Sequence, residues 1–335
     1  MFESETRPLI MPSSVIRGSY TDRGPQREEN QDACALPPVA VDEERLGTLL
    51  VVADGVGGRA GGAAASRDAV HYLQALYYAK SGSEQHDERL RQSVEMVNAL
   101  NRLTQQRLEQ TGGRLTTLVA AVVYHDRIWV ANVGDSRAYL VRASNGQRRQ
   151  LTEDHSQYNQ LIKAGLVDEN LKSEGVITQA IGLKDQLQVD IYRYHWQPGD
   201  RLILCSDGLS SLRPEVMADM ALNYAPQEAA QALVFRANVQ DGSDNSTAIV
   251  AGWGSRSDKQ KRQDVGPSWK RTFFYMVAGF LLGGVLSALL LLYYVPTPPI
   301  EPTDPITTGV IEQIELILQS TNELIEYFKE NAPQE

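Results

Sequence analysis

Residues 51–58 read Val51-Val52-Ala53-Asp54-Gly55-Val56-Gly57-Gly58, and this stretch is the most informative in the chain. The apolar run 48–53 predicts a buried strand, which ends on an aspartate followed by a glycine. Three more aspartates lie beside a glycine or asparagine near predicted strand ends: Asp135 in Gly-Asp-Ser-Arg, Asp207 in Ser-Asp-Gly-Leu and Asp244 in Asp-Asn-Ser-Thr. A single Asp-Gly pair usually marks only a turn, so the prediction of a site rests on the repetition.

These aspartates have the chemistry of a site for hard divalent cations. Mg²⁺ and Mn²⁺ prefer oxygen ligands and retain several waters. The histidines are scattered, and neither they nor the cysteines accompany the aspartates at the spacing of a zinc site. The sequence therefore predicts a carboxylate cage for Mn²⁺ or Mg²⁺.

A phosphate-binding group is predicted near the N-terminus, where residues 21–32 read Thr-Asp-Arg-Gly-Pro-Gln-Arg-Glu-Glu-Asn-Gln-Asp. Arg27 lies five residues before Asp32. An arginine guanidinium can bind a phosphate through paired N–H groups while a nearby aspartate faces the metals. A surface ion pair is the alternative use of Arg27.

Taken in their order along the chain, the segment 21–32 and the four aspartate motifs resemble those of the metal-dependent protein phosphatases of the PPM type, also called type 2C. The resemblance extends from about Ser14 to Trp253 and includes residues 115–117, 151–156 and 175–182. It implies an α+β fold, an αββα sandwich of two antiparallel β-sheets flanked by helix pairs. It also implies hydrolysis of phosphoserine and phosphothreonine in protein substrates, with a cognate Ser/Thr kinase as the opposing enzyme.

The resemblance assigns metal-binding roles. Asp54 would bridge two ions, the Gly55 carbonyl would reach one of them, and Asp207 and Asp244 would hold the other. A glycine suits this position because its backbone can approach a metal closely. The two ions would together activate a bridging hydroxide.

The remaining roles also come from the resemblance. Asp32 would bind waters on the metals, Arg27 would orient the phosphate, and Asp135 would join Asp207 at a weaker third metal site. For Asp135, a tight turn beside Arg137 is the alternative.

The chain departs from the family pattern at several positions. Val56 stands where many eukaryotic relatives have a histidine proposed as general acid, so the leaving group must be protonated by another group. Gln31 replaces a frequent glutamate, Leu115 a glycine and Gln179 an arginine. These differences bear on the substrate more than on metal binding.

Alternating apolar runs and helical periodicity predict the framework. Between residues 156 and 175 a short helix and a polar loop are predicted. In the family that the chain resembles, this stretch forms a flap beside the active site. An ordinary surface connection is the alternative. The predicted strands are 48–53, 118–124, 128–133, 138–142, 201–205 and 248–253, and the predicted helices are 62–80 and 88–110.

Composition excludes some classes of protein. The formal net charge of -10 argues against a nucleic-acid-binding face, which would be basic. Cys34 and Cys205 make no disulfide framework, and Cys205 is predicted to be a small buried hydrophobe. For His155, a structural hydrogen-bonding role is favoured over catalysis.

A membrane anchor is predicted near the C-terminus. Residues 273–295 form an uncharged, mostly apolar run of 23 residues, long enough to span a bilayer as a single helix. Residues 255–271 carry six Lys or Arg, whereas the segment after the run has eight acids and one Lys. The positive-inside rule then puts the catalytic domain in the cytoplasm and the protein in the cell membrane.

The remaining segments complete the predicted organisation. A stripe with 3-4 spacing is formed by Ile311, Ile314, Leu318, Thr321, Ile325 and Phe328. Self-association, a partner-binding or interfacial helix and a frayed tail are all open for it. Together with Gly279-x-x-x-Gly283, this stripe makes a homodimer one prediction. The predicted segments are a tail (1–13), a phosphatase domain (14–254), a basic linker (255–272), a transmembrane helix (273–295) and an extracytoplasmic segment (296–335).

The predicted function is therefore a membrane-anchored serine/threonine protein phosphatase that uses Mn²⁺ or Mg²⁺. Two alternatives remain: a regulatory phosphatase dedicated to one partner protein, and a pseudophosphatase that only binds.

Overall fold

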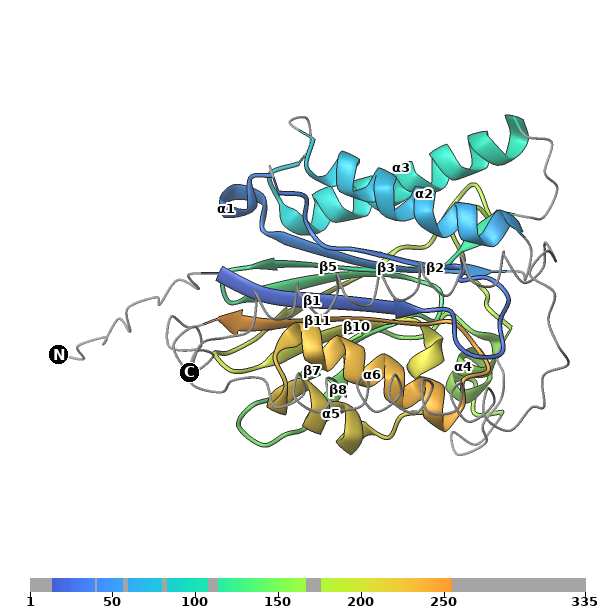
Figure 1. The fold of residues 1–335 in the computed structure, drawn as a ribbon. Coiled ribbons are helices and arrows are strands. Elements are labelled where there is room, and N and C mark those ends of the chain that lie inside the picture. The colour runs from blue at the N-terminus through green and yellow to red at the C-terminus, as the bar shows by residue number, and fades with distance from the viewer. Residues whose placement is uncertain are drawn as a thin grey trace, which may run out of the picture. The chain divides into compact units, whose positions relative to one another are not determined.

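The computed structural model describes residues 14–39, 41–56, 60–79, 83–107, 114–166 and 176–254. All of them belong to one compact unit, Met1–Arg262. Two antiparallel sheets pack face to face, and helices cover the outer face of each sheet (Figure 1). The predicted αββα sandwich is confirmed.

The first sheet has the strand order β2-β3-β5-β6-β9, with the short strand β4 paired to β3. Helices α2 (Ala60–Tyr77) and α3 (His86–Arg107) cover its outer face (Figure 1). The short helix α1 (Glu43–Leu46) precedes β3. The strands are β2 (Asp32–Ala35), β3 (Thr48–Val56), β4 (Leu115–Thr116), β5 (Leu118–Tyr124), β6 (Arg127–Val133) and β9 (Asp190–His195).

The second sheet has the order β1-β11-β10-β7-β8 and is covered by α5 (Pro214–Asn223) and α6 (Pro226–Gln240). Its β1 pairs with β11 along the full length of both strands, from Ser14 opposite Gly254 to Asp22 opposite Ser246. The first and last strands of the unit are therefore neighbours. The strands are β1 (Ser14–Asp22), β7 (Arg137–Val141), β8 (Arg148–Gln150), β10 (Arg201–Cys205) and β11 (Ser246–Gly254).

Both faces of strand β3 are buried, which explains its uninterrupted apolar sequence. Leu49 and Val51 pack against the helices α2 and α3, whereas Leu50 and Val52 pack between the sheets. At its end, the half-buried Asp54 therefore sits on a backbone that is fixed from both sides.

The predicted helices and strands are found with small shifts of their ends, and α4 (Gln157–Lys163) is the predicted short helix. A tight turn at His125-Asp126 joins the antiparallel strands β5 and β6, with His125 at φ 54°. The elements β1, β2, β4, β8, β9, α1, α5 and α6 were not predicted, because they are short or lack a long apolar run or a broad apolar stripe.

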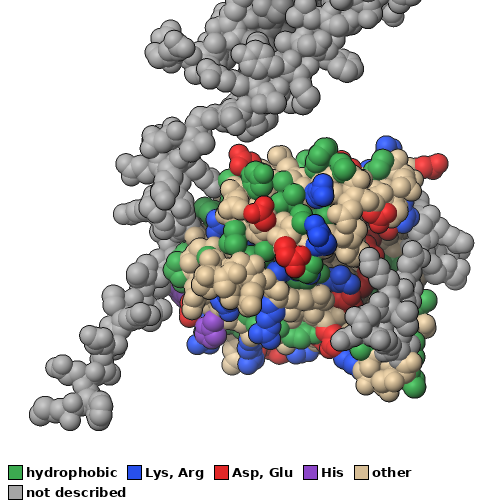
Figure 2. Space-filling view, turned by 90° about the horizontal axis from the view of Figure 1, so that it is seen from below, with side chains coloured by type: hydrophobic (Ala, Val, Ile, Leu, Met, Phe, Trp, Pro, Cys, Tyr) green, Lys and Arg blue, Asp and Glu red, His purple; other side chains and the backbone are tan. Residues whose placement is uncertain are grey.

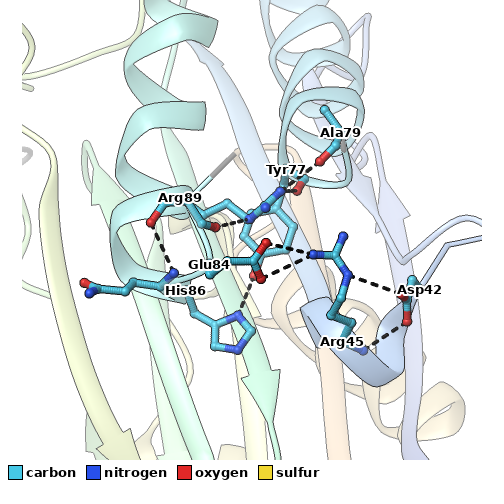
Figure 3. A network of polar contacts seen from close by, with 9 residues as sticks. Asp42, Arg45, Tyr77, Ala79, Glu84, His86 and Arg89 are labelled. Carbon is cyan, nitrogen blue, oxygen red and sulfur yellow. Dashed lines mark hydrogen bonds and ion pairs between the residues drawn. The ribbon is translucent and has the colours of Figure 1, made fainter. Parts of the chain in front are cut away.

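A polar network lies at the C-terminal end of α2 and the start of α3 (Figure 3). The buried Arg89 guanidinium donates to the backbone carbonyls of Tyr77 (2.9 Å), Ala79 (2.9 Å) and Ser83 (2.6 Å). The Tyr77 and Ala79 carbonyls lie at the C-terminal end of α2, where helical carbonyls lack intrahelical partners, whereas Ser83 precedes α3. The network therefore holds the helix pair in register over the sheet.

The face covered by α5 and α6 carries mixed side chains (Figure 2). Phe235 and Val239 are exposed one turn apart on α6, with exposed fractions of 70% and 62%. Basic and acidic side chains lie among the apolar ones in this view, so no single side-chain type dominates it.

The predicted membrane run 273–295 and the stripe 311–328 lie outside the described residues. Within the described ranges, no helix combines the length and the apolar character needed to cross a bilayer. The membrane anchor and the homodimer remain predictions.

Candidate active site

The structure brings the predicted aspartates to one end of the sandwich. Asp54 lies near the end of β3, directly opposite Asp32 at the start of β2. Asp207 follows β10, and Asp244 precedes β11. Asp135 lies in the turn between β6 and β7. These strand ends meet because the sheets are antiparallel and stacked, so residues from five parts of the sequence share one site (Figure 1).

A hydrogen bond joins the two sheets across this site. The Ser206 hydroxyl, just before Asp207, donates to Oδ2 of the buried Asp32 at 2.7 Å. The same hydroxyl oxygen accepts the Thr247 N–H at 3.0 Å. Ser206 therefore fixes the position of Asp32 relative to β10 and β11.

The backbone of Asp54 is held by a pair of threonines. Its N–H donates to the Thr117 hydroxyl at 3.0 Å, and its carbonyl accepts from the Thr117 N–H and the Thr116 hydroxyl, both at 2.8 Å. The Thr117 and Ser136 hydroxyls are 2.7 Å apart, which links this support to the turn that carries Asp135.

Gly55 lies where no larger residue fits. A Cβ at this position would lie 2.5 Å from the Gly62 carbonyl carbon and 2.7 Å from the Gln31 carbonyl oxygen. The Gly55 N–H donates to that same Gln31 oxygen at 3.1 Å. Because Gly55 has no Cβ, the backbone beside Asp54 can pack closely against the start of α2.

The carboxylates oppose one another's ionisation. Burial raises the pKa of Asp32 to about 6, and the charges of Asp207 and Asp244 add to this. Burial, followed by the charges of Asp207 and Asp154, raises the pKa of Asp135 to about 7. Burial is also the main cause that raises the pKa of Asp54 well above its ordinary value, and it raises that of Asp207 too. The site carries a concentrated negative charge that a cation would neutralise.

The donors present fit a hard cation. The buried Oδ1 atoms of Asp32, Asp135 and Asp207 have no hydrogen-bond partner, which is costly unless a cation or water binds there. Within the described ranges, however, no three acidic, histidine or cysteine side chains already form a closed ligand set. Oδ2 of Asp244 is paired with Arg27.

Arg27 lies on the loop between β1 and β2 and is bound to the segment before β11. Its Nε donates to the Ser243 carbonyl at 2.9 Å, and one terminal nitrogen donates to Oδ2 of Asp244 at 2.8 Å. Its side chain is 46% exposed, so the guanidinium also faces solvent. The predicted phosphate-binding group and a predicted metal ligand are thus direct neighbours.

The turn that carries Asp135 is held by His155, as its predicted hydrogen-bonding role requires. Nδ1 of His155 accepts the Gly134 N–H at 3.2 Å, so the ring proton lies on Nε2, 3.0 Å from Oδ2 of Asp190. Arg137, at the start of β7, pairs with Asp154 at 2.6 Å. These contacts constrain the turn through His155 and Arg137, and the two roles predicted for Asp135, metal ligand and turn residue, remain predictions.

Sequence reasoning missed the residues that position the aspartates: Thr117, Ser136, Ser206 and Asn245. Each is a small hydroxyl or amide residue within two positions of a predicted site residue or in the Thr-Thr pair. Short polar side chains beside a buried carboxylate often bind backbone groups, and this is the signal that could have identified them.

Lowering the pH is expected to stabilise the metal-free protein. Because Asp32 and Asp135 have raised pKa values when folded, the folded state holds more protons than the unfolded state between about pH 4 and 7. Stability should therefore fall as pH rises through this window, by on the order of 1–3 kcal/mol. Thermal unfolding in chelator at pH 5.5 and 7.5 measures the effect, and saturating Mn²⁺ should remove it. A melting temperature in chelator that increases with pH would contradict it.

Comparison with known proteins identifies the family. A family model described as Protein phosphatase 2C matches residues 25–245. The serine/threonine phosphatase stp of Listeria welshimeri is 32% identical over 253 residues, which cover 73% of this chain and 97% of that protein. Protein phosphatase PhpP of Streptococcus pneumoniae is 33% identical over 247 residues, covering 69% of this chain and 94% of that protein.

Solved structures give the same result. Serine/threonine phosphatase Stp1 from Staphylococcus aureus is similar with a TM-score of 0.65 and 28% identity, covering 75% of this chain and 100% of that one. The catalytic domain of the serine threonine protein phosphatase PstP, in complex with two manganese ions, has a TM-score of 0.61 and 27% identity, covering 71% and 99%. The chain belongs to the protein phosphatase 2C family of metal-dependent protein-serine/threonine phosphatases.

Proposed function

We propose that this protein is a membrane-anchored phosphatase that hydrolyses phosphoserine and phosphothreonine in protein substrates, with Mn²⁺ or Mg²⁺ bound between the sheets. One observation carries the proposal: four aspartates lie close to the Arg27–Asp244 pair at one end of the sandwich, namely Asp32, Asp54, Asp135 and Asp207. An anionic cage beside an exposed guanidinium suits a cation and a phosphate at adjacent positions.

The aspartates divide the work of holding the ions. Asp54, the Gly55 carbonyl, Asp207 and Asp244 would hold two ions, and Asp32 would accept hydrogen bonds from water beside them. Asp135 would add a donor for a further ion. When bound, such ions neutralise charge on a phosphoryl group and lower the pKa of a bound water.

The protein's own contribution to the reaction is positioning. Arg27 would bind the phosphoryl oxygens through its N–H groups and align the phosphorus for attack by water. The bond from phosphorus to the serine or threonine oxygen then breaks, and the leaving oxygen needs a proton. Val56 cannot supply this proton, so it comes from another group.

Turnover is expected to depend fully on divalent metal. A protein of residues 1–254 should hydrolyse a phosphothreonine peptide with Mn²⁺, fall to background in excess chelator and recover when Mn²⁺ is restored. Release of inorganic phosphate measures this. Activity that survives exhaustive chelation would contradict the use of the aspartates as metal ligands, and absence of turnover with any divalent metal would favour the binding-only alternative.

Substrate range decides between a general and a dedicated phosphatase. Comparison of the phosphoproteomes of wild-type and deletion strains should show many increased phosphosites for a general enzyme. A single affected protein would instead support a regulatory phosphatase with one partner.

Membrane anchoring is proposed from residues 255–335. The apolar run 273–295, six basic residues before it and eight acids after it support one transmembrane helix with the catalytic domain in the cytoplasm. Self-association through this helix and the stripe 311–328 is proposed on the same grounds.

Protease accessibility should reveal this topology. A tag at residue 335 should be cleaved when protease is added to intact spheroplasts, whereas a tag at residue 1 should be protected until lysis. Protection of both tags, or cleavage of the N-terminal tag alone, would refute the proposed orientation.

A further inference from the structure

The loop that carries Arg27 is neither helix nor strand, so no regular ladder of backbone hydrogen bonds supports it. It runs from the end of β1 at Asp22 to the start of β2 at Asp32, without helix or strand between them. A loop of this kind holds an arginine in a defined position only if other parts of the protein satisfy its backbone groups.

The side chain of Asn245 supplies three of these contacts. Its Oδ1 accepts the Gln31 N–H at 2.8 Å, and its Nδ2 donates to the carbonyls of Arg23 at 2.7 Å and Glu29 at 3.0 Å. Arg23 and Gln31 lie on either side of Arg27 in the sequence, so one buried amide closes the loop around it.

The backbone of Asn245 acts on the other half of the Arg27–Asp244 pair. Its N–H donates to Oδ1 of Asp244 at 2.7 Å, which leaves Oδ2 for Arg27. Asn245 is 5% exposed, and its carbonyl is packed so tightly that a Cβ on Gly208 would lie 2.0 Å away. The residue therefore has little freedom to move.

We propose that Asn245 is a positioning residue that sets the phosphate-binding geometry of Arg27. This inference rests on the proposed role of Arg27 as the phosphate ligand. Only an asparagine-like side chain combines the acceptor for Gln31 with two donors for the carbonyls. An aspartate of the same shape would keep the acceptor and direct an oxygen at both carbonyls.

A double-mutant cycle tests the proposal in the full-length protein with Mn²⁺. Asn245→Asp and Arg27→Ala should each raise KM for a phosphothreonine peptide, and the inhibition constant of inorganic phosphate, by about ten-fold. The double variant should differ from Arg27→Ala by less than about two-fold, since Asn245 acts through Arg27. Effects that multiply would overturn the proposal.

The matched control is Asn98→Ala. Asn98 is also buried (2% exposed), and it binds the Gly182 N–H and the Lys184 carbonyl away from Arg27. It should lower the melting temperature but leave KM unchanged. If Asn245→Asp behaved like this control, Asn245 would be only structural and the proposal would fail.

Hydrogen exchange of the metal-free protein gives a readout independent of activity. The Gln31 amide should lose protection in Asn245→Ala and keep it in Asn245→Asp, whereas Arg27→Ala should not change it.

If Asn245→Asp does not fold, Asn245→Ser enters the cycle in its place with the same expected coupling. Absence of wild-type turnover would count against the proposed function, whereas a functional Arg27 with an additive Asn245 would refute this inference alone.

Discussion

Asp54→Asn is expected to abolish turnover and, at the same time, to stabilise the metal-free protein at neutral pH. The substitution removes one charge from the proposed shared ligand, and activity should fall by about 10³-fold or more. Without metal, burial is the main cause that raises the pKa of the Asp54 carboxyl, and the charges of Asp32, Asp207, Asp135 and Asp244 add to it, so ionised Asp54 opposes folding. Removal of this charge should therefore add about 1–2 kcal/mol to the free energy of unfolding in chelator.

Phosphate release and denaturant unfolding, each with Mn²⁺ and with chelator, measure the two effects. Asp126→Asn is the matched control, because its side chain is 47% exposed and faces His195 on the surface. It should change neither quantity. Loss of stability in the metal-free Asp54→Asn protein would mean that Asp54 supports the fold rather than opposing it.

Gly208→Ala is expected to disrupt the site by steric conflict alone. The new Cβ would lie 2.0 Å from the Asn245 carbonyl oxygen and 2.8 Å from the Ser246 hydroxyl. Relief requires the turn after Asp207 to move away from Asp244 and Asn245. We expect a loss of about 3 kcal/mol in stability and about 100-fold weaker Mn²⁺ binding, measured by denaturant unfolding and calorimetry.

Gly146→Ala separates this steric effect from backbone strain. Gly146 has a φ of +68° but no atom within 4 Å of an added Cβ. The control should therefore cost about 1 kcal/mol and leave Mn²⁺ binding unchanged. If Gly208→Ala were no worse than this control, the packing of the Asp207 turn against Asn245 would not matter to the site.

The central strands were predictable because they are buried on both faces. The strand β3, with Leu49 and Leu50 on opposite sides, reads as one apolar run that no exposed element could maintain. Helix α6 was missed because half of its six buried residues are alanines, which give little contrast with the outer face. A proline at its first turn, Pro226, was the available signal.

The aspartates of the site were predictable from local motifs, but their supports were not. Asp54 and Asp207 stand beside glycines that the backbone requires, so their motifs are visible in a short window. The contacts of Asn245 with Arg23 and Glu29 join positions more than 200 residues apart, with separations of 222 and 216. The hydrophobic periodicity of the sequence cannot reveal such a pairing, because the pairing depends on how the two sheets stack.

The pairing of β1 with β11 has a consequence for the order of events during synthesis. Ser14 lies opposite Gly254, and the bond from Ser206 to Asp32 spans 174 residues. Contacts of such large sequence separation form late, because the loss of chain entropy on closing the loop precedes the gain from the contact. A nascent chain that has not released β11 from the ribosome lacks Asp244, Asn245 and the neighbour of its first strand. The site is therefore completed only after β11 has emerged, and products of translation that end before β11 carry the early aspartates without an assembled site.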